Sequence, residues 1–165
     1  MKVLVATGSK YGSTRGVGVA IGEKLEELGF DVDVRDACDV LGVHFYDAVV
    51  IGSAVYGGLW RRDASDLIRD HVLALRAREV YMFSVGMEPV VRPGQRLDEA
   101  EQLAYDVGAK EHVRFAGAIN WDKLNVGERA MMRVLNPPKG DFRDFDEITA
   151  WAQDVGFNLR AVAAV

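Results

Sequence analysis

The segment Thr7-Gly8-Ser9-Lys10-Tyr11-Gly12-Ser13-Thr14 decides the fold of this chain. A short apolar run at 2–6 precedes it and is too short for a helix, so it predicts a strand. After it, apolar residues recur at helical spacing from Val17 to Leu28, with charged residues on the opposite face. The segment is therefore predicted to be a hydroxyl- and glycine-rich loop between a strand and a helix.

This first loop has the chemistry of a phosphate site. A loop that opens a helix presents unpaired backbone N–H groups and the positive end of the helix dipole. Ser9, Ser13 and Thr14 add hydroxyl donors, Lys10 adds a positive charge, and Gly12 lets the backbone come close to a ligand. Such a loop favours a bound phosphate. Taken alone, it also fits an ordinary capped helix start.

Two widespread phosphate motifs do not match the first loop. The nucleotide-triphosphate motif G-x-x-x-x-G-K-[ST] fails because Gly8 and Gly12 are one residue too close and the lysine is missing. The dinucleotide motif G-x-G-x-x-G fails because Gly16, Gly18 and Gly22 are wrongly spaced and lie within the predicted helix. The first loop is therefore of a different kind.

Length and composition predict a single soluble domain over residues 1–165. The chain is 49% hydrophobic and 27% charged, which is typical of a globular protein. A net charge of −5 argues against nucleic-acid binding. The single Cys38 excludes an internal disulfide and a cysteine cluster for a metal. No signal peptide or membrane span is apparent, so we expect a cytoplasmic protein.

Strands and helices alternate along the rest of the chain. Further strands are predicted at 30–34, 46–52, 79–85 and 112–118, and further helices at 64–74, 95–107 and 145–163. This alternation predicts an α/β protein with a doubly wound, five-stranded parallel sheet between two layers of helices. The expected strand order is 2-1-3-4-5, in which ligands bind at the carboxyl ends of the strands.

Two more loops are predicted to reach the same sheet edge as the first. The second loop, 53–62, contains Gly57-Gly58, which allow a flat ring to lie close to the backbone, and Tyr56 and Trp60, which offer stacking faces. The third loop, 86–94, follows Ser84-Val85 and offers Gly86 and Met87 to the far side of a ring. Arginines at 61, 62, 92 and 96 predict a basic rim, or else solvated side chains without partners.

The first loop and the last third of the chain together resemble the flavodoxin family. The segments that carry the likeness in the last third include 115–119, 128–133, 143–145 and 150–152. They are similar to a branch that contains the menaquinone-dependent protoporphyrinogen oxidases, although the stretch after the fifth strand is shorter here and the third loop differs. The resemblance implies that the chain binds FMN.

The resemblance also implies which residues contact FMN. Those expected at its phosphate are Ser9, Lys10, Tyr11, Gly12, Ser13 and Thr14. Those expected around its ring are Ser53, Ala54, Val55, Tyr56, Gly57, Gly58, Trp60, Ser84, Val85, Gly86 and Met87. No catalytic side chain and no metal ligand is predicted, since a flavin supplies its own reactive atoms.

The leading hypothesis is an FMN-binding redox protein that passes electrons to a partner protein or to a small-molecule acceptor such as a quinone. One alternative is a flavin dehydrogenase of the menaquinone/protoporphyrinogen type with its own small substrate. Another is a partner-binding module without a cofactor. A receiver-type signalling domain shares the strand order, but it needs an acidic cluster after the first strand, where this chain has Thr7-Gly8-Ser9.

Residues 120–139 carry a net charge of +2 in this acidic chain. A helix is predicted over 124–135, with Leu124, Met131 and Leu135 on one side and Pro137-Pro138 after its end. The favoured interpretation is a packing helix that covers the sheet edge near the flavin. The second is a docking surface for an acidic partner or an anionic membrane.

Overall fold

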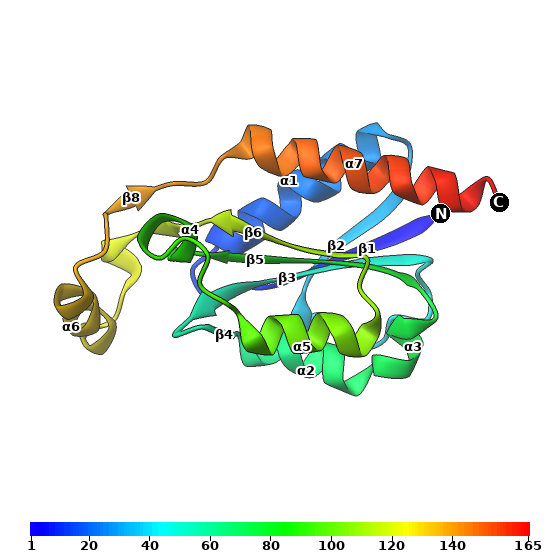
Figure 1. Cartoon of the computed structure of the whole chain (residues 1–165). Coiled ribbons are helices and arrows are strands. Elements are labelled where there is room, and N and C mark those ends of the chain that lie inside the picture. The colour runs from blue at the N-terminus through cyan, green and yellow to red at the C-terminus, as the bar shows by residue number, and fades with distance from the viewer.

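The computed structural model describes the backbone of all 165 residues and every side chain except that of Val91. The central sheet has five parallel strands: β1 (Lys2–Gly8), β2 (Asp31–Asp36), β3 (Ala48–Tyr56), β5 (Glu79–Gly86) and β6 (Glu111–Ala116). Their order, β2-β1-β3-β5-β6, confirms the predicted topology (Figure 1). A short strand, β4 (Leu59–Trp60), pairs antiparallel with the end of β3.

Helices cover both faces of this sheet (Figure 1). One layer consists of α1 (Ser13–Glu27) and α7 (Phe145–Ala163), and the other of α2 (Arg62–Asp70), α3 (Val72–Arg76) and α5 (Asp98–Val107). A single turn, η1 (Ala37–Asp39), follows β2. Because side chains alternate along a strand, β1 sends Val3 and Val5 into the core under α1 and α7 and Leu4 and Ala6 into the opposite core.

Two glycines of α1 hold that helix close to the sheet. A methyl group on Gly18 would lie 2.5 Å from Cγ2 of Thr7, and one on Gly22 would lie 2.5 Å from Cγ2 of Val34. Both distances are too short for carbon atoms that do not share a bond. These glycines therefore serve helix–sheet packing and are not part of a phosphate-binding turn.

The chain leaves the core after β6 and returns at α7. This segment contains β7 (Ala118–Ile119), η2 (Trp121–Lys123), α6 (Val126–Leu135) and β8 (Gly140–Asp141), and β7 pairs antiparallel with β8. We call residues 118–141 the strap. It lies beyond the carboxyl ends of the central strands (Figure 1). None of the residues of α6 is buried.

Several element boundaries differ from the sequence predictions. The predicted helix at 64–74 is two helices that meet at His71, and the helix predicted at 95–107 begins at Asp98. The third loop contains a short helix, α4 (Glu88–Val91). The described helices include none that is both long enough and apolar enough to cross a membrane.

Candidate functional site

The three predicted loops leave neighbouring strands at the same level of the sheet. Gly8 of β1 pairs with Ser53 of β3, and Ser53 pairs with Ser84 of β5. The carboxyl ends of these three strands therefore form one edge from which all three loops start. A single ligand can contact all of them there, as expected for a doubly wound sheet.

The first loop ends in an uncapped helix start. Gly12 is the N-cap of α1 at a φ of 92°, and no side chain caps the helix there. No capping side chain therefore accepts a hydrogen bond from the first N–H groups of α1. Ser9 Oγ accepts a hydrogen bond from Gly12 N at 3.1 Å. Thr14 Oγ1 is buried and has no hydrogen-bond partner among the described residues. Unpaired donors of this kind fit a phosphate.

The strap is bound to the first loop through Glu128. The Lys10 ammonium and the Tyr11 hydroxyl both donate to the Glu128 carboxylate. Asn125 and Glu128 also cap the start of α6 reciprocally. These hydrogen bonds, with that of Lys10 the strongest, lower the pKa of Glu128 to about 2. Lys10, predicted at the phosphate, is therefore engaged by a carboxylate of the strap.

Two further contacts hold the first loop from the same side. Lys123 Nζ donates to the carbonyl oxygen of Tyr11 at 3.2 Å. Arg143 Nη1 donates to the carbonyl oxygen of Ser13 at 3.2 Å, while its Nη2 is paired with Asp141 at 2.7 Å. Backbone carbonyls of the loop are thus bound by cations of the strap and its return, while the loop's N–H groups stay free of these contacts.

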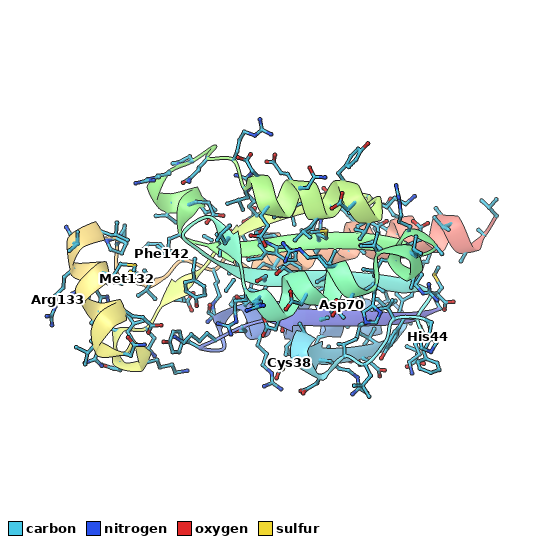
Figure 2. All side chains as sticks on the ribbon, turned by 90° about the horizontal axis from the view of Figure 1, so that it is seen from below. Cys38, His44, Asp70, Met132, Arg133 and Phe142 are labelled. Atoms are coloured by element: carbon cyan, nitrogen blue, oxygen red, sulfur yellow. The ribbon has the colours of Figure 1, made fainter. Side chains whose placement is uncertain are left out.

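A cavity of about 480 Å³ lies between the first loop and the strap. One side of the cavity is formed by Tyr11, Gly12 and Ser13 of the first loop. The rest of the lining is partly aromatic and apolar, and includes Tyr56, Ile119, Trp121, Leu124 and Met132. Figure 2 shows Met132 on the side of α6 that faces the rest of the molecule, with Arg133 on the outer side. The volume of the cavity lies within the range of small-molecule sites.

Tyr56 lies partly exposed at the sheet edge, beside a tight turn. Gly57 and Gly58 adopt φ angles of 59° and 80° in a tight turn between β3 and β4. Tyr56, at the start of that turn, keeps 45% of its surface exposed at the sheet edge. Burial of part of the ring raises the pKa of its hydroxyl, so Tyr56 is neutral at physiological pH.

Trp60 does not have the position that we predicted for it. It is only 5% exposed, and its indole Nε1 donates to Ser84 Oγ at 2.7 Å inside the core. Pairing of Leu59–Trp60 with β3 turns alternate side chains to opposite faces, which directs Trp60 inward. The prediction that Trp60 stacks on the ring is therefore corrected.

Ser53, at the start of the second loop, and Ser84, near the end of β5, also point inward. Ser53 Oγ donates to the Ala54 carbonyl and accepts from Arg61 N, at 2.8 and 2.9 Å. Ser84 Oγ is occupied by Trp60 and by His112 Nε2, the latter at 2.7 Å. Neither hydroxyl is available to a ligand, so only their backbone groups remain as candidate ring contacts.

His112 belongs to a buried polar group that sequence reasoning missed. Its ring packs edge-on against Trp60, with 6.2 Å between the centroids. Burial, helped by Arg114, lowers the pKa of His112 to about 4. The imidazole is therefore neutral at physiological pH. The alternating pattern of β6 places residue 112 on one face, but nothing in the sequence links it to Ser84.

The arginines near the edge are paired with acids. Arg61 lies 3.5 Å from Asp63, Arg62 lies 3.5 Å from Asp66, and Arg96 lies 3.1 Å from Glu101. The predicted basic rim is thus largely neutralised by neighbours that follow in α2 and α5. The alternative that these arginines have no partners does not hold for these three.

The remaining predicted ring contacts belong to the second loop, to the end of β5 and to the residue that follows it. Ala54 and Val85 are buried, Val55 is half-buried, and Gly86 ends β5. Met87 caps α4, which begins at Glu88. Sequence reasoning did not connect Lys123, Glu128 and Arg143 with the first loop. The pattern Asn125-x-x-Glu128 predicts a helix start, but it does not reveal what the glutamate binds.

A family model described as the flavodoxin domain matches residues 4–146. The chain is 23% identical to protoporphyrinogen IX dehydrogenase [quinone] of Escherichia coli strain K12, over 95% of this chain and 92% of that protein. Among solved structures, it is similar to a flavodoxin from the domain Archaea, with a TM-score of 0.68, 15% identity, and 97% and 99% of the two chains covered. Rubredoxin oxygen:oxidoreductase of Desulfovibrio gigas matches with a TM-score of 0.70 at 13% identity, over 99% of this chain and 37% of that one.

Proposed function

Because the chain belongs to the flavodoxin domain family, we propose that it binds FMN at the carboxyl edge of its sheet and passes electrons through the flavin. The observation that carries this function is the common level of Gly8, Ser53 and Ser84, from which three loops rise around one site. The uncapped start of α1 at Gly12 supports the placement of the phosphate.

FMN, when bound, supplies the chemistry of accepting and releasing electrons. The chain supplies binding and orientation. In this proposal, the N–H groups at the start of α1 and the hydroxyls of Ser13 and Thr14 hold the phosphate. Tyr56 covers one face of the ring, and Gly57 and Gly58 let the backbone approach the ring closely.

FMN reconstitution tests this function directly. Apoprotein is titrated with FMN, and binding is followed by flavin fluorescence and by the visible absorption bands. We expect tight, stoichiometric binding and reversible reduction by dithionite without oxygen. Riboflavin, which lacks the phosphate, should bind much more weakly. Equal affinities for FMN and riboflavin would contradict the phosphate site, and no binding of either would contradict the function.

The electron acceptor in this proposal is a small planar molecule such as a quinone, which reaches the flavin from the strap side of the cavity, at Trp121, Leu124 and Met132, while FMN takes the first-loop side. Two observations favour it over a partner protein. The cavity has an aromatic and apolar lining that includes Tyr56 and Trp121. The Escherichia coli relative, which covers nearly the same length, carries a quinone in its name.

Filling the cavity tests the acceptor site. Met132→Trp places a large side chain in the cavity, whereas Val134→Trp makes the same change at an 85% exposed position of the same helix. We expect Met132→Trp to slow reoxidation of the reduced holoprotein by menadione several-fold while FMN affinity is kept. Val134→Trp should reoxidise at the wild-type rate. Equal rates in both variants would contradict this acceptor site.

Helix α6 is tied to the first loop through Glu128, as the packing-helix interpretation of 120–139 expects, but none of its residues is fully buried. Val126, Met131, Val134 and Leu135 are exposed on it. We therefore propose that α6 docks on an anionic membrane surface, with Arg133 and Lys139 beside its apolar face.

Vesicle sedimentation tests the docking. Binding to vesicles of anionic lipid should fall as salt is raised, and Arg133→Glu together with Val134→Ser should abolish it. Arg76→Glu, at the distant end of α3, is the charge control and should bind as wild type. Equal sedimentation of wild type with neutral and anionic vesicles would contradict the proposal.

A further inference from the structure

The carboxyl group of Glu88 lies between the second and third loops. Glu88 is the first residue of α4, directly after Met87, and Pro89 follows it. A methyl group on Gly86 would overlap Oε2 of Glu88 and would lie 3.2 Å from Cβ of Val55. The glycine therefore leaves the space that the carboxyl group occupies, with Val55 on its other side.

This carboxyl group is poorly paired. Its Oε1 is buried and has no hydrogen-bond partner among the described residues. The one charged side chain that acts on it is Arg114 of β6, and Arg114 is already bound to Glu101 at 3.0 Å and to the carbonyl oxygen of Gln95. The neighbours from β3 and β5 are Val55 and Gly86, which carry no charge.

Burial raises the pKa of Glu88 above its usual range, although its own backbone N–H and Arg114 act in the opposite direction. A buried polar atom without a partner is unfavourable, and an apolar side chain would fill the same space without that disadvantage. The unpaired Glu88 carboxyl group is therefore a candidate ligand-binding group.

We propose that Glu88 is a flavin-binding residue whose carboxyl group, which lies beside Gly86 and Val55, hydrogen-bonds the polar edge of the flavin ring and in its neutral form donates its O–H to an acceptor atom there. This inference rests on the proposed FMN function. The polar edge of the oxidised ring presents the acceptors N1, O2, O4 and N5 around a single N–H donor at N3, and reduction adds a second N–H donor at N5. A neutral carboxylic acid can both donate and accept, whereas a carboxylate can only accept.

Ionisation of Glu88 then weakens binding of the oxidised ring, because the donor is lost and a negative charge is buried beside it. The affinity should be full below the pKa of Glu88 in the apoprotein. Above that pKa, the dissociation constant should rise by up to about tenfold for each pH unit. Glu88→Gln keeps an N–H donor of nearly the same shape and cannot ionise.

The test measures the dissociation constants of FMN and of riboflavin between pH 5 and 8.5 for wild type and Glu88→Gln. Riboflavin separates the ring from titration of the phosphate. We expect the ratio of wild-type to Glu88→Gln dissociation constants to rise with pH for both ligands. Glu23→Gln removes an exposed charge on α1. The ratio of its dissociation constants to those of wild type should not change with pH.

If the ratio of the wild-type to the Glu88→Gln dissociation constant does not change with pH, and both proteins bind FMN tightly, this inference is overturned and the proposed function stays intact. Absence of FMN binding at every pH would overturn both. If Glu88→Gln does not fold, infrared spectra of the wild-type apoprotein test whether a protonated carboxyl group responds to FMN. The C=O stretch of a protonated carboxyl should be present at the acid end of the pH range and should shift when FMN binds. An unshifted or absent band would overturn the inference.

Discussion

Two hydroxyl groups at the start of α1, those of Ser13 and Thr14, are expected to hold the FMN phosphate. A hydrogen bond to a charged group contributes about 1.5–3 kcal/mol, which is about 10- to 150-fold in a dissociation constant. Ser13→Ala and Thr14→Val should each weaken FMN binding by an amount in this range, as measured by fluorescence titration. Riboflavin affinity should not change. A parallel loss for riboflavin would show that the variants disturb the fold instead.

Tyr56 is expected to quench the flavin by stacking. The holoprotein should fluoresce weakly, and Tyr56→Ala should recover part of the emission. Trp60→Phe is the matched control, because Trp60 lies in the core and donates to Ser84. That variant should lose about 1 kcal/mol of stability in urea unfolding and keep the flavin quenched. Recovery of emission in Trp60→Phe but not in Tyr56→Ala would reverse the assignment.

His112 should make stability depend on pH. Its pKa is lowered from 6.5 to about 4 in the folded protein, so folding excludes a proton that the unfolded chain binds below pH 6.5. Its contribution is therefore complete above pH 6.5 and is lost as the pH falls toward 4. Allowing for partial exposure, the loss in the free energy of unfolding is on the order of 2 kcal/mol.

The measurement is urea unfolding at several pH values between 7 and 4. His112→Gln should unfold with a smaller change over this range than wild type does. His44→Gln, at an exposed position, should follow the wild-type curve. If wild type and His112→Gln lose stability in parallel, another group is responsible.

Among the elements, α6 is expected to be held on the first loop by Glu128. The lowered pKa of Glu128 means that this contact is complete above its usual value of 4.5 and is lost only as the pH falls toward about 2. At neutral pH, Glu128→Gln should increase amide hydrogen exchange in 126–135. It should also tighten FMN binding, because Lys10 becomes free for the phosphate.

Asp122→Asn is the control for this prediction. It removes the same charge from the strap, and the Asp122 side chain makes no described contact with the first loop. Exchange in 126–135 should then match wild type. Unchanged exchange in Glu128→Gln would mean that α6 is held by other contacts, such as that of Lys123 with the first loop.

Elements with a repeating apolar pattern were predicted well, and those without one were not. Strand β3 reads as a continuous apolar run because both of its faces are buried. The two residues of β4 are too few for any pattern, although Gly57-Gly58 is a hairpin signal that could have located the turn. That omission is what misplaced Trp60, because strand pairing determines which way its side chain points.

For the molecule as a whole, the order of the strands followed from alternation and from the loop after β1. The contacts between the strap and the first loop could not be predicted in this way. Lys10 and Glu128 are 118 residues apart, and no local pattern relates them. The uncapped glycine start of α1 was predictable from the first loop. The engagement of Lys10 was not, because it depends on how the strap folds back.

The strap leaves and rejoins the domain at almost one point. Phe142 N donates to the Gly117 carbonyl at 3.0 Å, and Ile119 pairs with Gly140. An Asn-Gly turn joining Ile119 directly to Gly140 would therefore close a hairpin without moving either end. Neither hydrophobic core contains a residue of 120–139. This region is thus a removable insertion: its replacement by such a turn should leave both cores, and the sheet from which the three loops rise, intact.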